Sequence, residues 1–558
     1  METDLDASWN DDLSTCLSIL QNRSDNFKRA LANQLESKTR ETIAELFSGP
    51  TNTPHQSVSM SPSRWDCPVQ KTNIFKKQTN LRQSPQNSTS RDISTQTINI
   101  IIPSLTVDVE ELQKVGGILH YEERQLYNLL TLKDPNVHVI YITALPLHPS
   151  IVNYYLSFLD EDPSERLTLF SVFDSSNTKS LTEKILERPR LHAKIRRTIE
   201  KLGSNTKTNM ICFIPTPLEH KLASLLQVPL EASPEDVQFW GSKCGSRQIF
   251  RECDVPLPRG IFESIWNKED LAKQIFVLWE KIPDTKRIIV KLNEGFSGEG
   301  NAMLLMDPIR ERLQGASDES SVVREITRAL ADLRFQAATE SWESFQERIT
   351  VLGCIIEEYI EGDDKKSPSL QGMIHPDGTT EIISTHEQIL GGVDGQVYLG
   401  CNFPCEVGYR LTLHDFGKRV ANSLAAKGAR GRFGIDFIVV PLEFDEFEIF
   451  ALEINLRQGG TTHPFETLHL LTNGEYSEKT GLYVSDRGEE KYYVASDNLK
   501  KDSYFGLLPS DLMMIIGKYD LMFDEETHLG VVFHLMGALS QFGKVGVTCI
   551  GNSIEEAQ

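Results

Sequence analysis

The chain has 558 residues, which is enough for three or four domains of ordinary size. Its hydrophobic fraction of 39% and charged fraction of 24% are typical of soluble globular proteins. The formal net charge of -22 argues against nucleic-acid binding as the main function, because phosphate backbones require basic patches. The acidic start METDLDASWNDD and the lack of long apolar runs predict no signal peptide, no membrane span and a cytoplasmic location.

The first 97 residues differ in amino-acid composition from the rest of the chain. Residues 12–47 predict one or two helices with a partial apolar stripe, and residues 48–97 are rich in Ser, Thr, Asn, Gln and Pro. Such a composition buries too little apolar surface to offset its ordering entropy. We therefore predict a disordered tail over 1–97, with recruitment of a protein partner as one role for it.

Residues 98–235 alternate between apolar strands and helices. Strands are predicted at 98–105, 137–143, 167–173 and 210–215, and helices at 150–159, 180–202 (interrupted at Pro189) and 218–226. This alternation predicts a parallel sheet in a Rossmann-like αβα domain. No G-x-G-x-x-G follows the first strand, so no dinucleotide site is predicted.

Residues 236–475 predict a second α/β domain with two subdomains, and 476–558 a C-terminal α/β subdomain. Helices are expected over 236–252, from 263 to 282, over 321–349 and over 414–428, and strands at 287–292, 301–306, 354–362, 371–375, 380–390, 431–441 and 447–457. The last segment predicts a helix over 511–520 and strands at 531–536 and 544–551. Cys401 and Cys405 have no second Cys/His pair at zinc spacing, so all nine cysteines are expected to be reduced thiols.

The strand at 447–457 carries polar side chains at every second position. Glu453, Asn455 and Arg457 are expected to project from one face, with Ala451 before them, because strand residues alternate between faces. If 431–441 and 447–457 pair as a hairpin, Asp436 lies beside Glu453. Carboxylate and carboxamide oxygens suit Mg²⁺. The alternative is the charged outer face of an antiparallel sheet.

Two lysines are candidates for binding phosphate. Lys291 ends a strand just before the Gly-rich loop NEGFSGEGN, and Lys243 stands before a predicted helix. The alternatives are an ordinary flexible hairpin and a surface lysine. The strand CIIEEYIEGDD could hydrogen-bond to an adenine and to ribose hydroxyls. The alternative is a strand at the edge of a sheet that ends in a solvated acidic turn.

The order of these features resembles the ATP-grasp superfamily over residues ~240 to ~475, with the αβα domain ahead of it. The stretch LEINLRQGGTTHPFETL resembles the peptide-ligase branch that acts in the synthesis of peptidic antibiotics. A related domain also occurs in larger eukaryotic proteins that bear IQ motifs. This sequence has no I-Q-x-x-x-R-G pattern, so no calmodulin binding is inferred.

The resemblance implies a role for each matching residue. Phosphates would be bound by Lys243 and Lys291, and covered by Gly298, Glu299 and Gly300. Glu357, Glu358 and Ile360 would lie at the adenine, and Asp364 or Asp363 at the ribose. Mg²⁺ would be bound by Asp436, Glu453 and Asn455, and the acyl phosphate would face Arg457, with Gly460, Thr461, Thr462 and His463 on the acceptor side.

The implied activity is that of a carboxylate–amine ligase, which forms a peptide-type bond through an acyl phosphate and releases ADP and phosphate. Its cofactors would be ATP and Mg²⁺, with Mn²⁺ as a substitute, and its substrates a small carboxylate (an amino acid or peptide) and an amine. One alternative is a catalytically silent ATP-binding scaffold whose tail recruits a protein. Another is phosphoryl transfer to a different acceptor, or attack by a thiol.

Overall fold

The computed structural model describes residues 96–114, 116–202, 206–294, 300–313, 318–336, 340–362, 364–391, 395 and 397–558. Most of the tail expected over 1–97 therefore lies outside the described residues, as do Gly298, Glu299 and Asp363. The elements discussed below belong to one compact unit, Thr89–Lys500 with Leu507–Gln558. The short turn η5 (Asp502–Tyr504) lies outside this unit.

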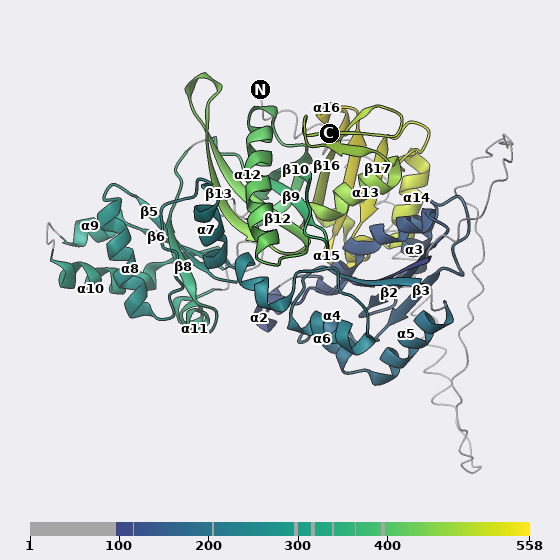
Figure 1. Ribbon diagram of the computed structural model, residues 1–558, viewed down its shortest axis with the longest axis horizontal. Coiled ribbons are helices and arrows are strands. Elements are labelled where there is room, and N and C mark those ends of the chain that lie inside the picture. The colour runs from purple at the N-terminus through teal and green to yellow at the C-terminus, as the bar shows by residue number, and fades with distance from the viewer. Residues whose placement is uncertain are drawn as a thin grey trace, which may run out of the picture. The chain divides into compact units, whose positions relative to one another are not determined.

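The first sheet has four parallel strands in the order β3-β2-β1-β4, which confirms the predicted Rossmann-like arrangement (Figure 1). Ile98, Ile100 and Ile102 pack against α4, α5 and α6, while η1 and α3 pack together beside β2. Pro189 begins α5 and separates it from α4, as expected from a residue without a backbone N–H. The elements are β1 (Gln96–Ile102), α2 (Val109–Lys114), η1 (Ile118–Lys133), β2 (Val137–Thr143), α3 (Pro149–Leu156), β3 (Leu167–Ser171), α4 (Leu181–Leu186), α5 (Pro189–Lys201), β4 (Thr206–Cys212) and α6 (Pro217–Leu226).

The second sheet has four antiparallel strands in the order β7-β6-β5-β8, covered by α8–α11. The helix expected from residue 263 starts later, because the Asn267 side chain caps it by accepting the Asp270 N–H. The insert at 321–349 was expected to be helical throughout, but Arg334–Phe335 pairs with β6 as a short strand. The elements are α8 (Lys268–Lys281), β5 (Arg287–Leu292), β6 (Asn301–Leu305), α9 (Asp307–Leu313), α10 (Glu319–Ala329), η3 (Leu330–Asp332), β7 (Arg334–Phe335), α11 (Trp342–Leu352) and β8 (Cys354–Glu358).

The third sheet has ten strands, ordered β13-β12-β9-β10-β11-β16-β15-β14, with β18 pairing to β16 and β17. Its strands are β9 (Pro368–Ile374), β10 (Thr380–Gly391), β11 (Val397–Phe403), β12 (Gly431–Pro441), β13 (Phe447–Asn455), β14 (Glu475–Ser477), β15 (Leu482–Val484), β16 (Glu490–Lys500), β17 (Gly530–His534) and β18 (Lys544–Gly551). Strand β16 joins the C-terminal strands to the sheet that carries β12 and β13, so both regions share one hydrogen-bonded framework.

Helices α7 and α12 pack on the third sheet around a core that includes Leu370, Phe433 and Ile454 (Figure 1). The remaining elements are η2 (Glu235–Gly241), α7 (Lys243–Glu252), α12 (Val407–Ala426), η4 (Glu443–Asp445), α13 (Thr462–Thr472), α14 (Pro509–Tyr519), η6 (Met536–Ala538), α15 (Leu539–Phe542) and α16 (Ile554–Ala557). Among the described residues, no helix combines the length and the apolar character needed to cross a bilayer.

Candidate functional site

A cavity of about 950 Å³, here called the central cavity, is lined by residues of the second and third sheets and of segments that flank the first sheet. Many residues selected from the sequence line it: Lys291, Glu357, Glu358, Ile360, Asp436, Glu453, Asn455, Arg457, Gly460 and Thr461. Lys243, Gly300, Asp364, Thr462 and His463 are outside its lining. Asp364 is exposed, and its assignment to the ribose stays a prediction, as do the roles of Gly298 and Glu299.

Three oxygen-bearing side chains, here called the oxygen-donor cluster, meet on the hairpin of β12 and β13. Asp436 and Glu453 are direct partners across the two strands, as the hairpin prediction requires, and Asn455 lies opposite Gly434. The Asn455 amide nitrogen donates to Asp436 Oδ2 at 3.0 Å and to Glu453 Oε1 at 3.2 Å. This donor therefore stands between two carboxylates, where a cation would also be stabilised. The donor set fits a hard divalent ion such as Mg²⁺.

The expectation that Ala451 shares a face with Glu453 is wrong. The register of β12 and β13 shifts after the Asp436–Glu453 pair, so that Phe437 pairs with Ala451 and Leu452 is the extra residue of a bulge. Ala451 is consequently buried in the core with Ile454, whereas Leu452 lines the central cavity. The bulge changes the side-chain alternation just before Glu453 and Asn455.

The two carboxyl groups of this cluster sit in different electrostatic surroundings. Burial, together with the neighbouring Glu453, raises the pKa of Asp436. Burial also favours the neutral form of Glu453, but the Lys243 ammonium, with Lys291 beyond it, outweighs this and holds the Glu453 pKa low. Gln388 Nε2 donates to Asp436 Oδ1 at 2.8 Å, which orients that carboxyl group. A bound cation would favour ionisation of both groups.

The ammonium group of Lys291 lies in a buried network of charges between β5 and β8. Its ammonium forms an ion pair with Glu357, and Arg247 Nη1 donates to the second oxygen of Glu357 at 2.9 Å. Glu357 and Arg247 are each only 1% exposed. Glu358 is bound by Arg259, whose Nε donates to it at 2.7 Å. Both glutamates thus have cationic partners in this structure, and their contact with an adenine stays a prediction.

Lys243 is the first residue of α7 and reaches the oxygen-donor cluster. Ser242 caps the helix by accepting the Gly245 N–H, and the Lys243 ammonium forms an ion pair with Glu453. Its backbone N–H donates to the Asn293 carbonyl at 3.1 Å, and Cys244 N–H donates to Asn293 Oδ1 at 3.0 Å. Asn293 belongs to the loop after β5, so it ties the start of α7 to the Gly-rich hairpin.

The segment after β13 places Arg457 beside the oxygen-donor cluster. Arg457 Nη2 donates to Asn455 Oδ1 at 2.8 Å, and Nη1 donates to the Gln458 carbonyl at 3.1 Å. Thr462 Oγ1 accepts the Gly459 N–H at 2.9 Å, which closes the turn that exposes Gly460 and Thr461 to the cavity. Thr462 and His463 are buried behind this turn.

Several residues that line or support the cavity were not expected from the sequence. Arg247, Asn293 and Gln388 support the predicted residues by hydrogen bonds, and Arg124 and Asp497 line the cavity as a buried ion pair. Asp497 lies on β16, which was not predicted, although KYYVAS alternates in the manner of a strand. Arg124 carries no recognisable signal in the sequence.

Comparison with known proteins matches two regions of the chain. Residues 234–479 match the family model described as IQCH-like, ATP-grasp, and residues 511–558 match the PGM1 C-terminal domain. The L-propargylglycine–L-glutamate ligase of Streptantibioticus cattleyicolor is 28% identical over 454 residues, which are 80% of this chain and 89% of that protein. IQ motif-containing protein H of Danio rerio is 21% identical over 419 residues, which are 68% of this chain and 39% of that protein.

Solved structures also resemble this fold. Pyruvate carboxylase of Rhizobium etli, in a structure with the allosteric activator acetyl coenzyme A, matches with a TM-score of 0.50 and 10% identity, covering 83% of this chain and 36% of that chain. Biotin carboxylase of Campylobacter jejuni, in a complex with β-γ-ATP, matches with a TM-score of 0.49 and 12% identity, covering 83% and 89%. At such low identity the likeness concerns the fold alone.

Proposed function

We propose, because residues 234–479 match a model of an ATP-grasp family, that the protein is an ATP-dependent carboxylate–amine ligase that works through an acyl phosphate. One observation carries the proposal. The oxygen-donor cluster, Lys243 and Lys291 meet beside one cavity, with Arg457 next to them. A triphosphate requires hard oxygen donors for its metal ion and cations for its own oxygens, and this arrangement supplies both.

In the proposed reaction, a substrate carboxylate oxygen attacks the γ-phosphorus of ATP, and the bond to the bridging oxygen breaks to release ADP. An amine then attacks the acyl carbon, loses a proton, and expels phosphate to leave an amide. Activation is needed because a carboxylate has no good leaving group at neutral pH. Mg²⁺, held by Asp436, Glu453 and Asn455, would neutralise phosphate charge when bound.

The lysines would act by exchanging partners. In this structure Lys243 and Lys291 form ion pairs with Glu453 and Glu357. Phosphate oxygens can compete for both ammonium groups, and Arg247 would continue to neutralise Glu357. Coordination of a metal by Glu453 would likewise free Lys243 for the triphosphate. The ion pairs therefore hold both lysines beside the cavity before ATP arrives.

Arg457 is proposed to stabilise charge on the reacting acyl group. Its guanidinium already donates to Asn455, so it lies next to the proposed metal ligands. A planar fork of donors suits the oxyanion of the tetrahedral intermediate or the departing phosphate. Gly460 and Thr461, on the following turn, line the cavity and would contact the amine substrate.

Amino acids are the substrates we propose for both roles. This step rests on the relative that is named an L-propargylglycine–L-glutamate ligase. The alternative of a silent nucleotide-binding scaffold is favoured by the second relative, which is named for an IQ motif and not for a reaction. The presence of both lysines together with the whole oxygen-donor cluster favours the enzyme, because nucleotide binding alone does not need every one of these groups.

The test is ADP release from Mg²⁺-ATP in pools of amino acids and short peptides, with product masses measured for each active pool. Glu453→Gln should abolish ADP release. Glu448→Gln is the matched control, since Glu448 is exposed on the same strand, away from the cavity, and should leave the rate unchanged. A product lighter than its two substrates by one water is a condensation product, and its stability to hydroxylamine, which cleaves thioesters, identifies an amide.

Three results would argue against the proposal. ATP binding without ADP release in any pool would favour the scaffold, and a phosphorylated product or a thioester would favour the other acceptors. Absence of ATP binding would remove the nucleotide site altogether.

A further inference from the structure

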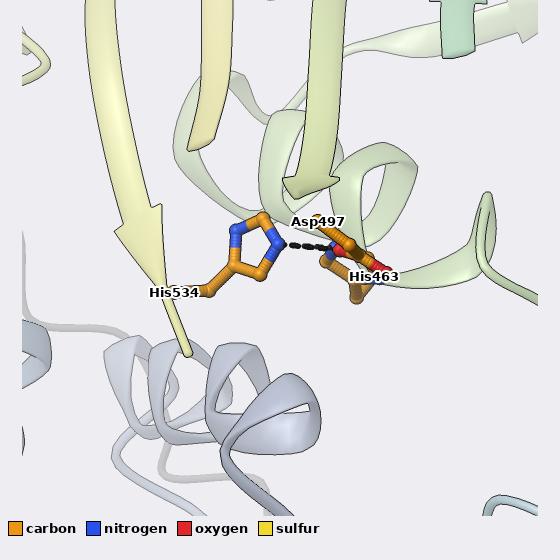
Figure 2. A group of neighbouring side chains, drawn as sticks. All are labelled: His463, Asp497 and His534. Carbon is orange, nitrogen blue, oxygen red and sulfur yellow. Dashed lines mark hydrogen bonds and ion pairs between the residues drawn. The ribbon is translucent and has the colours of Figure 1, made fainter. Parts of the chain in front are cut away.

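Outside the oxygen-donor cluster, three buried side chains converge behind the cavity wall, and we call them the histidine cluster: His463, Asp497 and His534. They come from α13, β16 and β17, and Figure 2 shows the His534 ring facing the Asp497 carboxylate, with the His463 ring beside that carboxylate. All three are at most 5% exposed. Elements far apart in the chain therefore deliver two nitrogens and an oxygen to one point.

The distances within the histidine cluster are short for three separate side chains. His463 Nε2 and His534 Nε2 are 3.0 Å apart, and they lie 3.2 Å and 2.7 Å from the same oxygen, Asp497 Oδ1. If both nitrogens carry protons, two N–H groups face each other. If only one nitrogen carries a proton, that single proton lies among three close lone-pair sites: the two nitrogens and the Asp497 oxygen. A cation that accepts one lone pair from each atom resolves this conflict.

The surroundings hold the three groups in these positions. Arg124 pairs with Asp497 Oδ2, which leaves Oδ1 directed at the imidazoles. A Cβ on Gly546 would lie 2.1 Å from His534 Nε2, so glycine at this position leaves room for the ring. His463 Nδ1 is buried, and within the described residues it has no hydrogen-bond partner, so Nε2 makes the polar contacts of that ring.

We propose that His463 Nε2, His534 Nε2 and Asp497 Oδ1 bind a divalent transition-metal ion, with Zn²⁺ as the best fit. The ligand atoms of these three side chains all lie within 4.8 Å of one another, which is close enough for one metal ion to contact each of them. Two imidazoles and one carboxylate are a donor set that suits Zn²⁺, whereas Mg²⁺ prefers oxygen ligands alone.

This site differs from the oxygen-donor cluster in position and in chemistry, and it does not depend on the ligase activity. Asp497 lines the central cavity, which gives the ion a path of entry. A water molecule or a carboxylate in the cavity can complete the coordination. A carboxylate ligand would also offset part of the positive charge that the ion adds beside Arg124.

The first test is metal content by mass spectrometry after the full-length protein has been loaded with Zn²⁺ and dialysed. We expect one Zn²⁺ per chain in the wild type, and binding weaker by at least about tenfold in His463→Asn and in His534→Asn. His375→Asn is the control, because His375 is partly exposed in the turn after β9 and pairs with Glu381. Glu453→Gln should also keep its Zn²⁺, which separates this proposal from the nucleotide site.

A second measurement covers the case in which the histidine variants do not fold. Co²⁺ added to the folded wild type should give d–d absorption bands that one equivalent of Zn²⁺ abolishes and excess Mg²⁺ does not. The proposal is overturned if folded wild type retains no Zn²⁺, if folded histidine variants retain as much as wild type, or if Mg²⁺ displaces Co²⁺ equally well.

Discussion

Glu357 lies at the centre of the most deeply buried charge network near the cavity. Two cations contact its carboxylate, Lys291 on one oxygen and Arg247 on the other. A buried carboxylate is costly unless it is paired and hydrogen-bonded. Arg247 also donates to the carbonyls of Ile261 and Pro258, so its guanidinium joins α7 to the segment before α8.

We predict that Arg247→Met lowers the free energy of unfolding by about 3–5 kcal/mol, because one partner of a buried ion pair is removed. Urea unfolding measures this loss. Arg259→Met is the matched control, since Arg259 pairs with Glu358 but its side chain is 67% exposed. An exposed pair contributes about 0–1 kcal/mol, so similar losses in both variants would contradict the argument.

Glu122 is a buried acid away from the proposed reaction. Burial raises its pKa from 4.5 to about 8, although its side chain accepts the Ala144 N–H at 2.7 Å. A raised carboxyl pKa means that the folded protein holds a proton which the unfolded chain releases above about pH 4.5. The associated stability is present below that pH and is lost as the pH rises through about 8.

We therefore predict that Glu122→Gln, which keeps an acceptor for Ala144, becomes more stable relative to wild type as the pH rises from about 4.5 to about 8. Each pKa unit corresponds to about 1.4 kcal/mol, and relaxation around the buried group reduces the full value, so we expect a change of roughly 1–3 kcal/mol. Chemical unfolding at several pH values measures it. The exposed Glu165→Gln should show no such trend, and a flat difference for Glu122→Gln would refute the prediction.

At the scale of elements, the junction between η2 and α7 decides where Lys243 lies. Gly245, in the first turn of α7, approaches the backbone of η2 so closely that a Cβ would lie 2.1 Å from the Phe239 carbonyl oxygen. Only glycine permits this contact without displacement of one element. The same turn carries Lys243, whose ammonium must reach Glu453 on β13.

We predict that Gly245→Ala destabilises the protein by about 1–3 kcal/mol and weakens Mg²⁺-ATP binding, because α7 must move away from η2. Thermal unfolding and nucleotide titration measure the two effects. The control for stability is Gly116→Ala, where the nearest atom would lie 3.8 Å from the new Cβ. Unchanged nucleotide binding in a destabilised Gly245→Ala protein would show that α7 does not position Lys243.

At the scale of the whole molecule, hydrogen bonds connect the N-terminal αβα region to the C-terminal strands. Tyr155 Oη donates to the Phe533 carbonyl at 3.2 Å, and Phe533 N–H donates to Tyr154 Oη at 3.0 Å. The Arg124–Asp497 ion pair makes a further connection between η1 and β16. These buried contacts, together with the shared third sheet, favour cooperative unfolding of the whole unit.

We predict that a protein lacking residues 1–95 unfolds in one cooperative transition and still binds Mg²⁺-ATP, because all the described strands begin at or after Gln96. Calorimetry and nucleotide titration test both points. Separate transitions, or loss of cooperativity, in the truncated protein would contradict this boundary.

The sequence alone determined the features that depend on short stretches of chain. The alternation of apolar strands with helices predicted the parallel strands of the first sheet, and one hairpin was enough to place Asp436 beside Glu453. The strand before the Gly-rich loop likewise carries Lys291 as expected. Such features follow from the periodicity of the side chains along a strand or helix and from the pairing of strands that are adjacent in the sequence.

Only the tertiary structure decided which distant groups meet. The sharing of Glu357 between Lys291 and Arg247 and the meeting of His463 with Asp497 and His534 have no local signal. Each depends on how sheets and helices pack, and a buried polar group takes whichever partner the packing brings within reach. Chain order does not specify that partner, because the groups that meet are carried by elements far apart in the sequence.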